Sequence, residues 1–524
     1  MLRRGRRAAT FAARPDANEP SIRRVPAKPL RALAVPAKPP RACPPTWGAL
    51  ALGLAVAALW VAPPGASAAH RVTVTAALQR LQRGGAITET AYRQYQGAYS
   101  AAKTSLRKLS GTRAAELGAV VANVEAMATS NLLTASRLPV VFTTLERNRQ
   151  WWTTERLLGA DQRVSFTGSK VVWEYYPGQG VEIQWLATFG KANGYFFAKE
   201  TTALKEVLNE AIALATQRAG GIAWEYMFHF DGGLPPWTSG LSQGTAIQVL
   251  ARAWSVTHEQ SYLTAAQQAL GIFKTGPSAG VRVATPAGAH YLEYTYAPSE
   301  RILNGFIQSL VGLYEYTKLT GDPLGQQLFE AGDAEARAEV PHYDTGAWSK
   351  YDQSSESDLN YHELLAEFLE HLCEKTGKGE PLTPTTGQIP GDAIYCTTAK
   401  EFREDVKTPP VIELLTQSVK TNERAGIQLK LSKISSVSMV IKLGEKPVWI
   451  NNVTVEGGRP RLLWVTPPKP GVYSVALRAR DLAGNEEVAS GSITVKPPSK
   501  AGRKSARAAR VERISPPARR LPAL

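Results

Sequence analysis

The chain has 524 residues, of which 44% are hydrophobic and 20% charged, and a formal net charge of +16. This length allows two or three domains with a large core, and this hydrophobic content excludes a chain that is disordered throughout. The charge does not indicate a nucleic-acid-binding core, because residues 1–44 hold 11 Lys/Arg against 2 Asp/Glu, residues 496–524 hold 9 against 1, and residues 45–495 hold 41 against 42. We therefore expect two basic, disordered tails, residues 1–45 and 496–524.

An uncharged apolar run, TWGALALGLAVAALWVA, extends from Thr46 to Ala62. It is followed by Pro-Pro and by Ala-Ser-Ala at residues 66–68, which is the pattern of a signal cleavage site. The run is short for a spanning helix of about 20 residues, but the basic region before it is long for a signal peptide. Residues 46–69 therefore predict an exported protein, secreted after cleavage or anchored at the outer face of a bacterial cytoplasmic membrane.

Residues 70–137 are rich in alanine and show helical spacing, with a break at Gly84-Gly85, so two or three helices are expected there. A further helix carries Trp151-Trp152. The extended stretch VVWEYYPGQGVEIQW follows and leads into another helix. Its Tyr175, Tyr176 and Gln179 either line a cleft and bind substrate, or pack over the core.

Helical pairs recur at residues 244–273 and 304–337, and another begins at residue 361. Equivalent apolar positions in the first two pairs are 60 residues apart. Repeated helical hairpins with one apolar face each predict a mainly α fold, an incomplete (α/α) toroid over residues 138–382. Its cleft would collect the residues at the helix starts.

The stretch LEYTYAPSERILNGFIQSLVGLYEY, residues 292–316, places a polar lead-in before a helix with one apolar face, and Pro298-Ser299 is expected to mark the helix start. The helix-start residues that could meet in the cleft are Glu293, Tyr294, Tyr343 and Tyr361.

The cysteines Cys373 and Cys396 form an even pair, and in an exported protein they indicate a disulfide, with free buried thiols as the alternative. Residues 383–407 are predicted to be a linker. From residue 408 to 495, alternating segments such as IQLKLS and YSVALRARDLAGN predict a small β-sandwich. Its closing segment resembles bacterial immunoglobulin-like domains, which usually serve as spacers or attachment modules.

The segments HYLEYTYAPSERILNGFIQSLVGLYEY, VPHYDTGAWSKYD and LNYHELLAEFLEHL resemble, in order, the C-terminal domain of the D-glucuronyl C5-epimerase family. An earlier segment, LPPWTSGLSQGTAIQVLARAW, resembles the entrance helix of that domain. The resemblance covers residues 173–373. It implies a glucuronate-containing polysaccharide as substrate and no cofactor, and the sequence itself shows no metal-ligand motif.

Such an enzyme removes the hydrogen on carbon 5, next to the sugar carboxylate, and returns a proton to the opposite face. The resemblance implies that Glu293, Tyr294, Tyr343 and Tyr361 surround this hydrogen. We expect Tyr361 and Glu293 to be the proton-transfer pair and Tyr294 and Tyr343 to donate hydrogen bonds, with a nearby cation lowering the pKa of a tyrosine that acts as base.

One departure from the family concerns the loop AWSKYDQSSESDL, which is shorter than its counterpart and lacks arginine. Lys350 or Arg301 would then hold the sugar carboxylate, with His362 as a further substrate ligand. Asp344 and Asn304 are expected to be structural, orienting the turn and the helix entrance.

Three other functions fit the sequence. A uronate polysaccharide lyase forms the same carbanion and expels the oxygen on carbon 4. An inverting glycoside hydrolase needs two facing carboxylates, which could come from Glu174, Glu182, Asp231 and Glu293. A non-catalytic cell-surface protein would bind glycan through the same surfaces. The sequence does not fix the oligomeric state.

Overall fold

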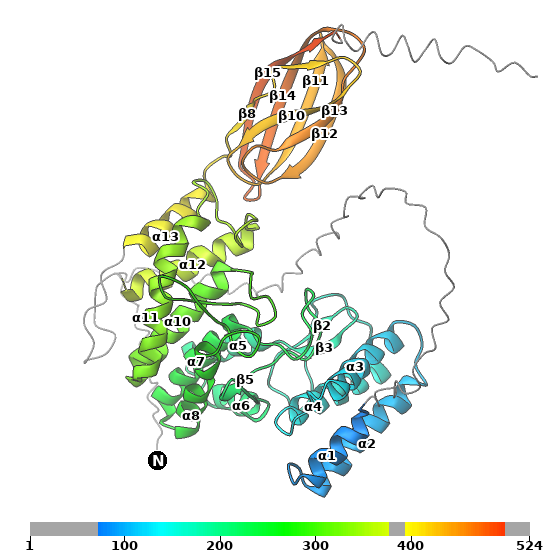
Figure 1. The fold of residues 1–524 in the computed structure, drawn as a ribbon, viewed down its shortest axis with the longest axis vertical. Helices are drawn as coiled ribbons and strands as arrows, with labels where there is room; N and C mark the ends of the chain where they lie inside the picture. Colours follow the sequence, from blue (N-terminus) through cyan, green and yellow to red (C-terminus); the bar gives the residue numbers. More distant parts are fainter. Residues whose placement is uncertain (1–71, 377–392, 498–524) are drawn as a thin grey trace, which may run out of the picture. The chain divides into compact units, whose positions relative to one another are not determined.

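The computed structural model describes residues 72–376 and 393–497, which form a helical part followed by β-sheets (Figure 1). The helices are α1 (Val74–Arg83), α2 (Glu89–Leu106), α3 (Gly111–Thr129), α4 (Leu138–Thr154), α5 (Trp185–Phe197), α6 (Thr201–Ala213), α7 (Gly240–Thr257), α8 (Gln260–Ala269), α9 (Gly271–Lys274), α10 (Leu303–Thr320), α11 (Pro323–Glu339), the short 3-10 helix η1 (Val340–Tyr343), α12 (Leu359–Thr376) and α13 (Ala393–Asp405). The strands are β1 (Arg163–Val164), β2 (Trp173–Tyr176), β3 (Gly180–Ile183), β4 (Thr216–Arg218), β5 (Gly221–Ala223), β6 (Arg282–Ala284), β7 (Ala289–Tyr291), β8 (Ile412–Leu414), β9 (Ser418–Lys420), β10 (Arg424–Leu431), β11 (Ser435–Leu443), β12 (Lys446–Val455), β13 (Arg461–Val465), β14 (Gly471–Asp481) and β15 (Glu486–Lys496).

The first helices form where alanine-rich sequence meets a capping threonine. The hydroxyl groups of Thr73 and Thr88 accept the N–H groups of Ala76 and Ala91, each at 3.1 Å, at the starts of α1 and α2. These bonds satisfy N–H groups that have no partner within the helix. Helix α1 ends at the predicted break, Gly84-Gly85.

The central helices form successive hairpins, α5 with α6, α7 with α8, α10 with α11, and α12 with α13. The first members contact one another in chain order, α5 against α7, α7 against α10, and α10 against α12. The predicted helical pairs are therefore confirmed, and the pair that begins near residue 361 is completed by α13.

Helix α10 differs from the prediction of a single buried face, because 14 of its residues are buried. It packs against α7 at backbone distance: a Cβ added to Gly312 would lie 2.1 Å from the carbonyl oxygen of Gly244. Figure 1 shows these two helices side by side. The helix also starts later than predicted, at Leu303, because Pro298 and Ser299 lie in turns closed by bonds such as Glu300 N–H to the Ala297 carbonyl, at 3.1 Å.

Residues 393–405, predicted as part of a linker, form α13. Tyr395, Ala399 and Phe402 follow helical spacing and are all buried, which explains why this segment packs. The structure joins Cys373 of α12 to Cys396 of α13 in a disulfide, with the two Cα atoms 4.9 Å apart.

The C-terminal strands form two sheets, one of three strands in the order β13-β10-β8 and one of five in the order β12-β11-β14-β15-β9. Alternate residues of β10 and β11 are buried. Side chains of both sheets, among them Ile427, Met439, Trp464 and Tyr473, share one hydrophobic core. The alternating pattern in the sequence therefore predicted these sheets correctly.

Within residues 72–376 and 393–497, no helix combines the length and the apolar character needed to cross a membrane. The predicted signal or anchor at residues 46–69 lies outside the residues that the structure describes, as do residues 1–45 and 498–524.

We expect Gly312→Ala to lower the free energy of unfolding by about 3 kcal/mol, because the new methyl group would overlap the backbone of α7. Gly97→Ala is the matched control, since no heavy atom lies within 4 Å of its added Cβ in helix α2, and it should gain about 0.5–1 kcal/mol. Urea unfolding followed by circular dichroism measures both changes. Equal effects of the two substitutions would contradict the close contact.

Candidate active site

An extended segment, residues 292–296, carries Glu293 and Tyr294 close to the starts of α7 and α10. The Gly240 N–H, in the first turn of α7, donates to the Glu293 carbonyl at 3.1 Å, and the Thr295 N–H donates to the Thr238 carbonyl at 3.1 Å. Ser239 and Tyr294 form an isolated β-bridge. These backbone bonds fix the direction of both side chains.

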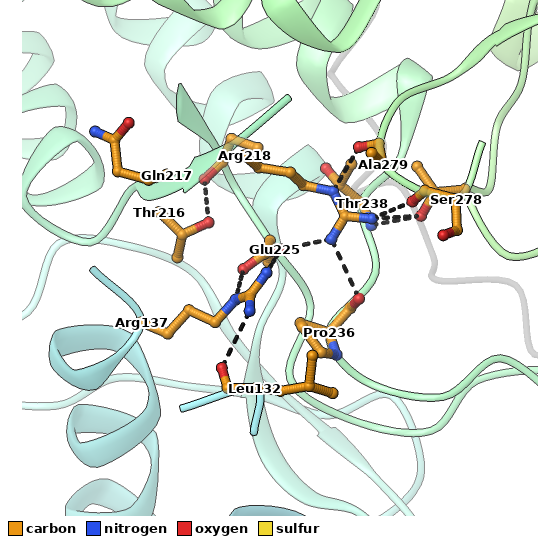
Figure 2. A network of polar contacts seen from close by, with 12 residues as sticks. Leu132, Arg137, Thr216, Gln217, Arg218, Glu225, Pro236, Thr238, Ser278 and Ala279 are labelled. Carbon is orange, nitrogen blue, oxygen red and sulfur yellow. Dashed lines mark hydrogen bonds and ion pairs between the residues drawn. The ribbon is translucent and has the colours of Figure 1, made fainter. Parts of the chain in front are cut away.

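A buried ion network supports this segment (Figure 2). The carboxylate of Glu225 accepts hydrogen bonds from Arg137, at 2.7 and 2.9 Å, and from Arg218. Arg218 also donates to the Thr295 hydroxyl at 3.4 Å. Burial raises the pKa of Glu225, but the two arginines outweigh it and the pKa is lowered. The network therefore joins the start of α4 to residues 292–296.

Glu293 is buried, with 6% of its surface exposed. A Cβ added to Gly305 would lie 2.5 Å from its Oε2 atom, so only glycine in the first turn of α10 leaves room for this carboxylate. Oε2 has no hydrogen-bond partner among the described residues. Burial raises the pKa of Glu293 to about 7, against the opposing effect of a hydrogen bond from Tyr294. The carboxylate is thus poised to exchange protons near neutral pH.

Three tyrosines continue from Glu293 in a row, which we call the tyrosine row: Tyr294, Tyr351 and Tyr361. The three phenols are close enough to affect one another: Tyr351 raises the pKa of Tyr294, and Tyr361 raises the pKa of Tyr351, each in addition to the larger effect of burial. The rings of Tyr351 and Tyr361 have centroids 4.6 Å apart. Tyr361 is held in the first turn of α12, where its N–H donates to the Asp358 carboxylate at 2.9 Å.

The phenols of the tyrosine row are firmly protonated. Burial raises the pKa of each, and the negative charge of Glu293 raises it further. The main causes of these shifts include no cation, which differs from the expectation that a cation activates a tyrosine as base. The row can therefore donate protons, and Glu293 is the group that can accept one.

A family model described as the D-glucuronyl C5-epimerase C-terminus matches residues 218–383, the segment that contains Glu293 and the tyrosine row. This segment is therefore similar to the C-terminal part of D-glucuronyl C5-epimerases. A D-glucuronyl C5-epimerase of Caenorhabditis elegans is 37% identical over 133 residues, which are 23% of this chain and 22% of that protein.

An uncharacterized protein of Methanocaldococcus jannaschii is 26% identical over 191 residues, 35% of this chain and 58% of that protein. The chain thus spans less than two thirds of either relative. Among solved structures, an α-mannanase of Bacteroides thetaiotaomicron aligns with a TM-score of 0.34 and 12% identity, over 47% of this chain and 66% of that one.

Tyr343, which the sequence placed around the reacting hydrogen, uses its hydroxyl to bond the protein backbone. It is 3% exposed, and its hydroxyl donates to the backbone carbonyl of Arg301 at 2.9 Å. The charges that shift its pKa include those of Glu339 and Arg301 but not that of Glu293. Its hydroxyl therefore fixes the backbone before α10.

Of the two cations predicted to hold the sugar carboxylate, Arg301 lies close enough to His290 and Glu339 to shift their pKa values. Burial lowers the pKa of His290 and raises that of Glu339, whose side chains are 2.8 Å apart, and the charge of Arg301 shifts both pKa values downward. The backbone N–H of Lys350 donates to the Tyr343 carbonyl at 2.8 Å, a bond that does not involve the ammonium group. Neither cation is among the described groups that shift the pKa of Glu293.

His362 is a packing residue of the family domain, which corrects its prediction as a substrate ligand. Its ring is fully buried and stacks on Trp348 with centroids 3.7 Å apart. Nδ1 accepts the Ser349 N–H at 3.1 Å, and Nε2 donates to the Phe402 carbonyl at 2.8 Å. Burial lowers its pKa to about 4, so the ring is neutral at pH 7.

Tyr175 and Gln179 also bind protein groups. The Tyr175 hydroxyl donates to Glu116 at 2.8 Å, and Glu116 accepts the N–H groups of Gly178 and Gly180 at 3.0 Å. The Gln179 side-chain oxygen accepts the His229 N–H at 3.0 Å. These two residues therefore hold the β2-β3 hairpin in place, and of the three predicted cleft residues only Tyr176 adjoins the site.

Tyr176 belongs to a continuous group of rings that reaches Tyr294. Its ring stacks on Phe228 at 4.5 Å, and Phe230 and Trp237 lie 5.9 and 5.7 Å from Tyr294. We call this group the aromatic wall: Tyr176, Phe228, Phe230, Trp237, Tyr294 and Tyr296. Tyr176, Phe230 and Tyr296 are half-buried, so parts of the wall are accessible.

The carboxylates considered for glycoside hydrolysis show no arrangement that marks two of them as a catalytic pair. Glu174 is ion-paired with Arg163 at 2.8 Å. Glu182, opposite Glu174 in the hairpin, is buried and its pKa is raised well above the usual range. Asp231 raises the pKa of Tyr296.

Tyr351 was missed in the sequence, although it stands in the segment VPHYDTGAWSKYD that carries the family resemblance. Tyr343 was predicted as the site residue of this segment because it begins the Tyr-Asp-Thr-Gly turn. A second tyrosine followed by aspartate, eight residues later, was the available signal.

We expect Glu293→Gln to stabilise the protein at pH 8 by about 3 kcal/mol and to have little effect at pH 4. The folded-state pKa of about 7 lies above the ordinary 4.5, so wild-type stability falls as pH rises through this window, and the amide removes that loss. Denaturant unfolding at both pH values tests this. The control Glu225→Gln should instead destabilise at pH 8 by about 3–5 kcal/mol, because it leaves two buried arginines short of their partner. A Glu293→Gln effect that is independent of pH would contradict the raised pKa.

Proposed function

We propose that this protein is a carbohydrate epimerase that inverts carbon 5 of glucuronate residues in a polysaccharide. One observation carries the proposal: a buried carboxylate with a pKa near 7 is joined to a row of protonated tyrosines. This arrangement lies within the segment that matches the C5-epimerase family.

In the proposed reaction, Glu293 takes the proton from carbon 5, and the electron pair of the broken C–H bond moves toward the sugar carboxylate. Tyr361 then gives its proton to carbon 5 from the opposite face. This leaves Glu293 protonated and Tyr361 ionised. In this proposal the neighbouring phenols of Tyr294 and Tyr351 pass a proton from Glu293 back to Tyr361, which restores both groups for the next cycle.

The aromatic wall supports a polymeric substrate, because ring faces in a binding site offer apolar contact to sugar rings. We further propose that the helical hairpins form an incomplete (α/α) toroid, supported by the contact order α5-α7-α10-α12. The C-terminal sheets would be an immunoglobulin-like spacer or attachment module, and the apolar run at residues 46–62 would direct export.

Incubation with glucuronate-containing polysaccharides in heavy water tests the reaction. We expect deuterium at carbon 5, read by NMR, in a polymer of unchanged length. Unsaturated, ultraviolet-absorbing chain ends would show a uronate lyase instead, because that enzyme expels the oxygen on carbon 4. Binding without exchange on any of these polymers would support the non-catalytic glycan-binding alternative.

Two Tyr→Phe substitutions distinguish the effect of a tyrosine in the row from that of a tyrosine outside it. Tyr351→Phe breaks the row, so exchange should fall about 100-fold or more, while polymer binding persists. Tyr343→Phe removes only the bond to the Arg301 carbonyl. It should cost about 1 kcal/mol of stability and leave exchange nearly unchanged. Exchange rates and unfolding curves measure both variants, and a larger loss of exchange for Tyr343→Phe would sink this assignment.

A further inference from the structure

Buried polar atoms without hydrogen-bond partners gather within residues 293–304. They are Glu293 Oε2, the Tyr296 hydroxyl, one guanidinium nitrogen of Arg301, and both amide atoms of Asn304; none is bonded to a group of the described structure. Buried polar side chains are nearly always bonded, so such a concentration needs an explanation. A polar ligand bound at this stretch would supply it.

Asn304 is the most unusual member of this group. It is 3% exposed, and neither its oxygen nor its nitrogen is bonded within residues 72–376 and 393–497. The sequence assigned it a structural role at the helix entrance, but no bond of that kind is present. Asn304 is the second residue of α10, where side chains lean toward the N-terminal end of the helix.

The start of α10 also offers free backbone donors. Ile302 stands at the N-cap and has no side-chain oxygen to cap the helix. The Leu303 N–H donates to the Tyr351 carbonyl at 3.4 Å, whereas the N–H groups of Asn304 and Gly305 have no acceptor within the described structure. The positive end of the helix dipole lies here as well.

This turn is next to the proposed base, because Glu293 Oε2 lies 2.5 Å from the Cβ position of Gly305. An anion held by the first turn of α10 would therefore have its neighbouring carbon beside Glu293. A glucuronate carboxylate has that relation to carbon 5.

We propose that Asn304 and the first turn of α10 bind the carboxylate of the reacting glucuronate residue. The Asn304 amide nitrogen and the free N–H groups donate to its oxygens, in place of the arginine that the short loop lacks. When the C5–H bond breaks, its electron pair forms a C5–C6 double bond and the carboxylate oxygens gain a second negative charge. Donors fixed beforehand at those oxygens stabilise that charge.

This inference rests on the proposed function, and its test uses the full chain. The probes are a hexasaccharide of alternating glucuronate and N-acetylglucosamine and the same hexasaccharide with its carboxylates reduced to alcohols. Isothermal titration calorimetry gives the affinity of each protein for both. Wild type should prefer the uronate form.

Asn304→Asp places a negative charge at the site, on a side chain of nearly the same shape as asparagine. We expect it to lower affinity for the uronate probe about 10- to 100-fold, the range for a lost hydrogen bond to a charged group, and to leave affinity for the reduced probe nearly unchanged. Retained binding of the reduced probe shows that the variant is folded. Asn304→Ser keeps a hydrogen-bond donor, so its affinity for the uronate probe should lie between those of wild type and Asn304→Asp.

Gln308→Glu is the matched control, because it introduces the same charge one turn further along α10, where the Gln308 amide bonds the Thr245 hydroxyl at 3.4 Å. It should keep the preference for uronate. A preference that survives in Asn304→Asp, or a wild type that binds both probes equally or neither, overturns the carboxylate site.

The two proposals can fail separately. If wild type exchanges deuterium at carbon 5 but Asn304→Asp keeps its preference, the carboxylate site is wrong and the epimerase function stands. If wild type shows an Asn304-dependent preference without exchange on any uronate polymer, the carboxylate site stands and the epimerase function is wrong.

Discussion

The contact between α7 and α10 is the constraint on which the rest of the site depends. Gly244 and Gly312 let the two backbones meet without intervening side chains. The starts of both helices are thereby brought to residues 292–296, where Gly240 bonds the backbone of Glu293 and Gly305 makes room for its carboxylate. A bulkier contact would separate the helices and change the surroundings of Glu293, the proposed base.

Two buried carboxylates show how partners decide chemistry. Glu225 and Glu293 are both almost fully removed from solvent. Two arginines keep the pKa of Glu225 low, so it serves as a permanent charge that holds backbone in place. Glu293 has only a tyrosine hydroxyl, and its pKa rises to about 7. The carboxylate with a structural role is the well-partnered one, and the carboxylate proposed as the base is the poorly partnered one.

Local patterns in the sequence predicted the helical pairs and the C-terminal strands, because periodicity and helix starts are local properties. The functional roles of Glu293 and Tyr294 stay predictions. Local patterns did not predict the roles of Tyr351, Tyr343 and His362. Those roles depend on partners distant along the chain, such as Tyr294 for Tyr351 and the Phe402 carbonyl for His362. Helix α13 was not predicted, because the Pro- and Gly-rich sequence before it led us to expect a linker over the whole of residues 383–407.

The ion network around Glu225 sets a lower limit on the size of the working unit. The match to the epimerase family begins at residue 218, yet one of the two arginines that neutralise Glu225 is Arg137, at the start of α4. A fragment cut at the family boundary would bury a carboxylate with half of its counter-charge missing, beneath the segment that carries Glu293. The segment that matches the family is therefore shorter than the part of the chain needed to support the site. That part extends back to the N-terminal helices.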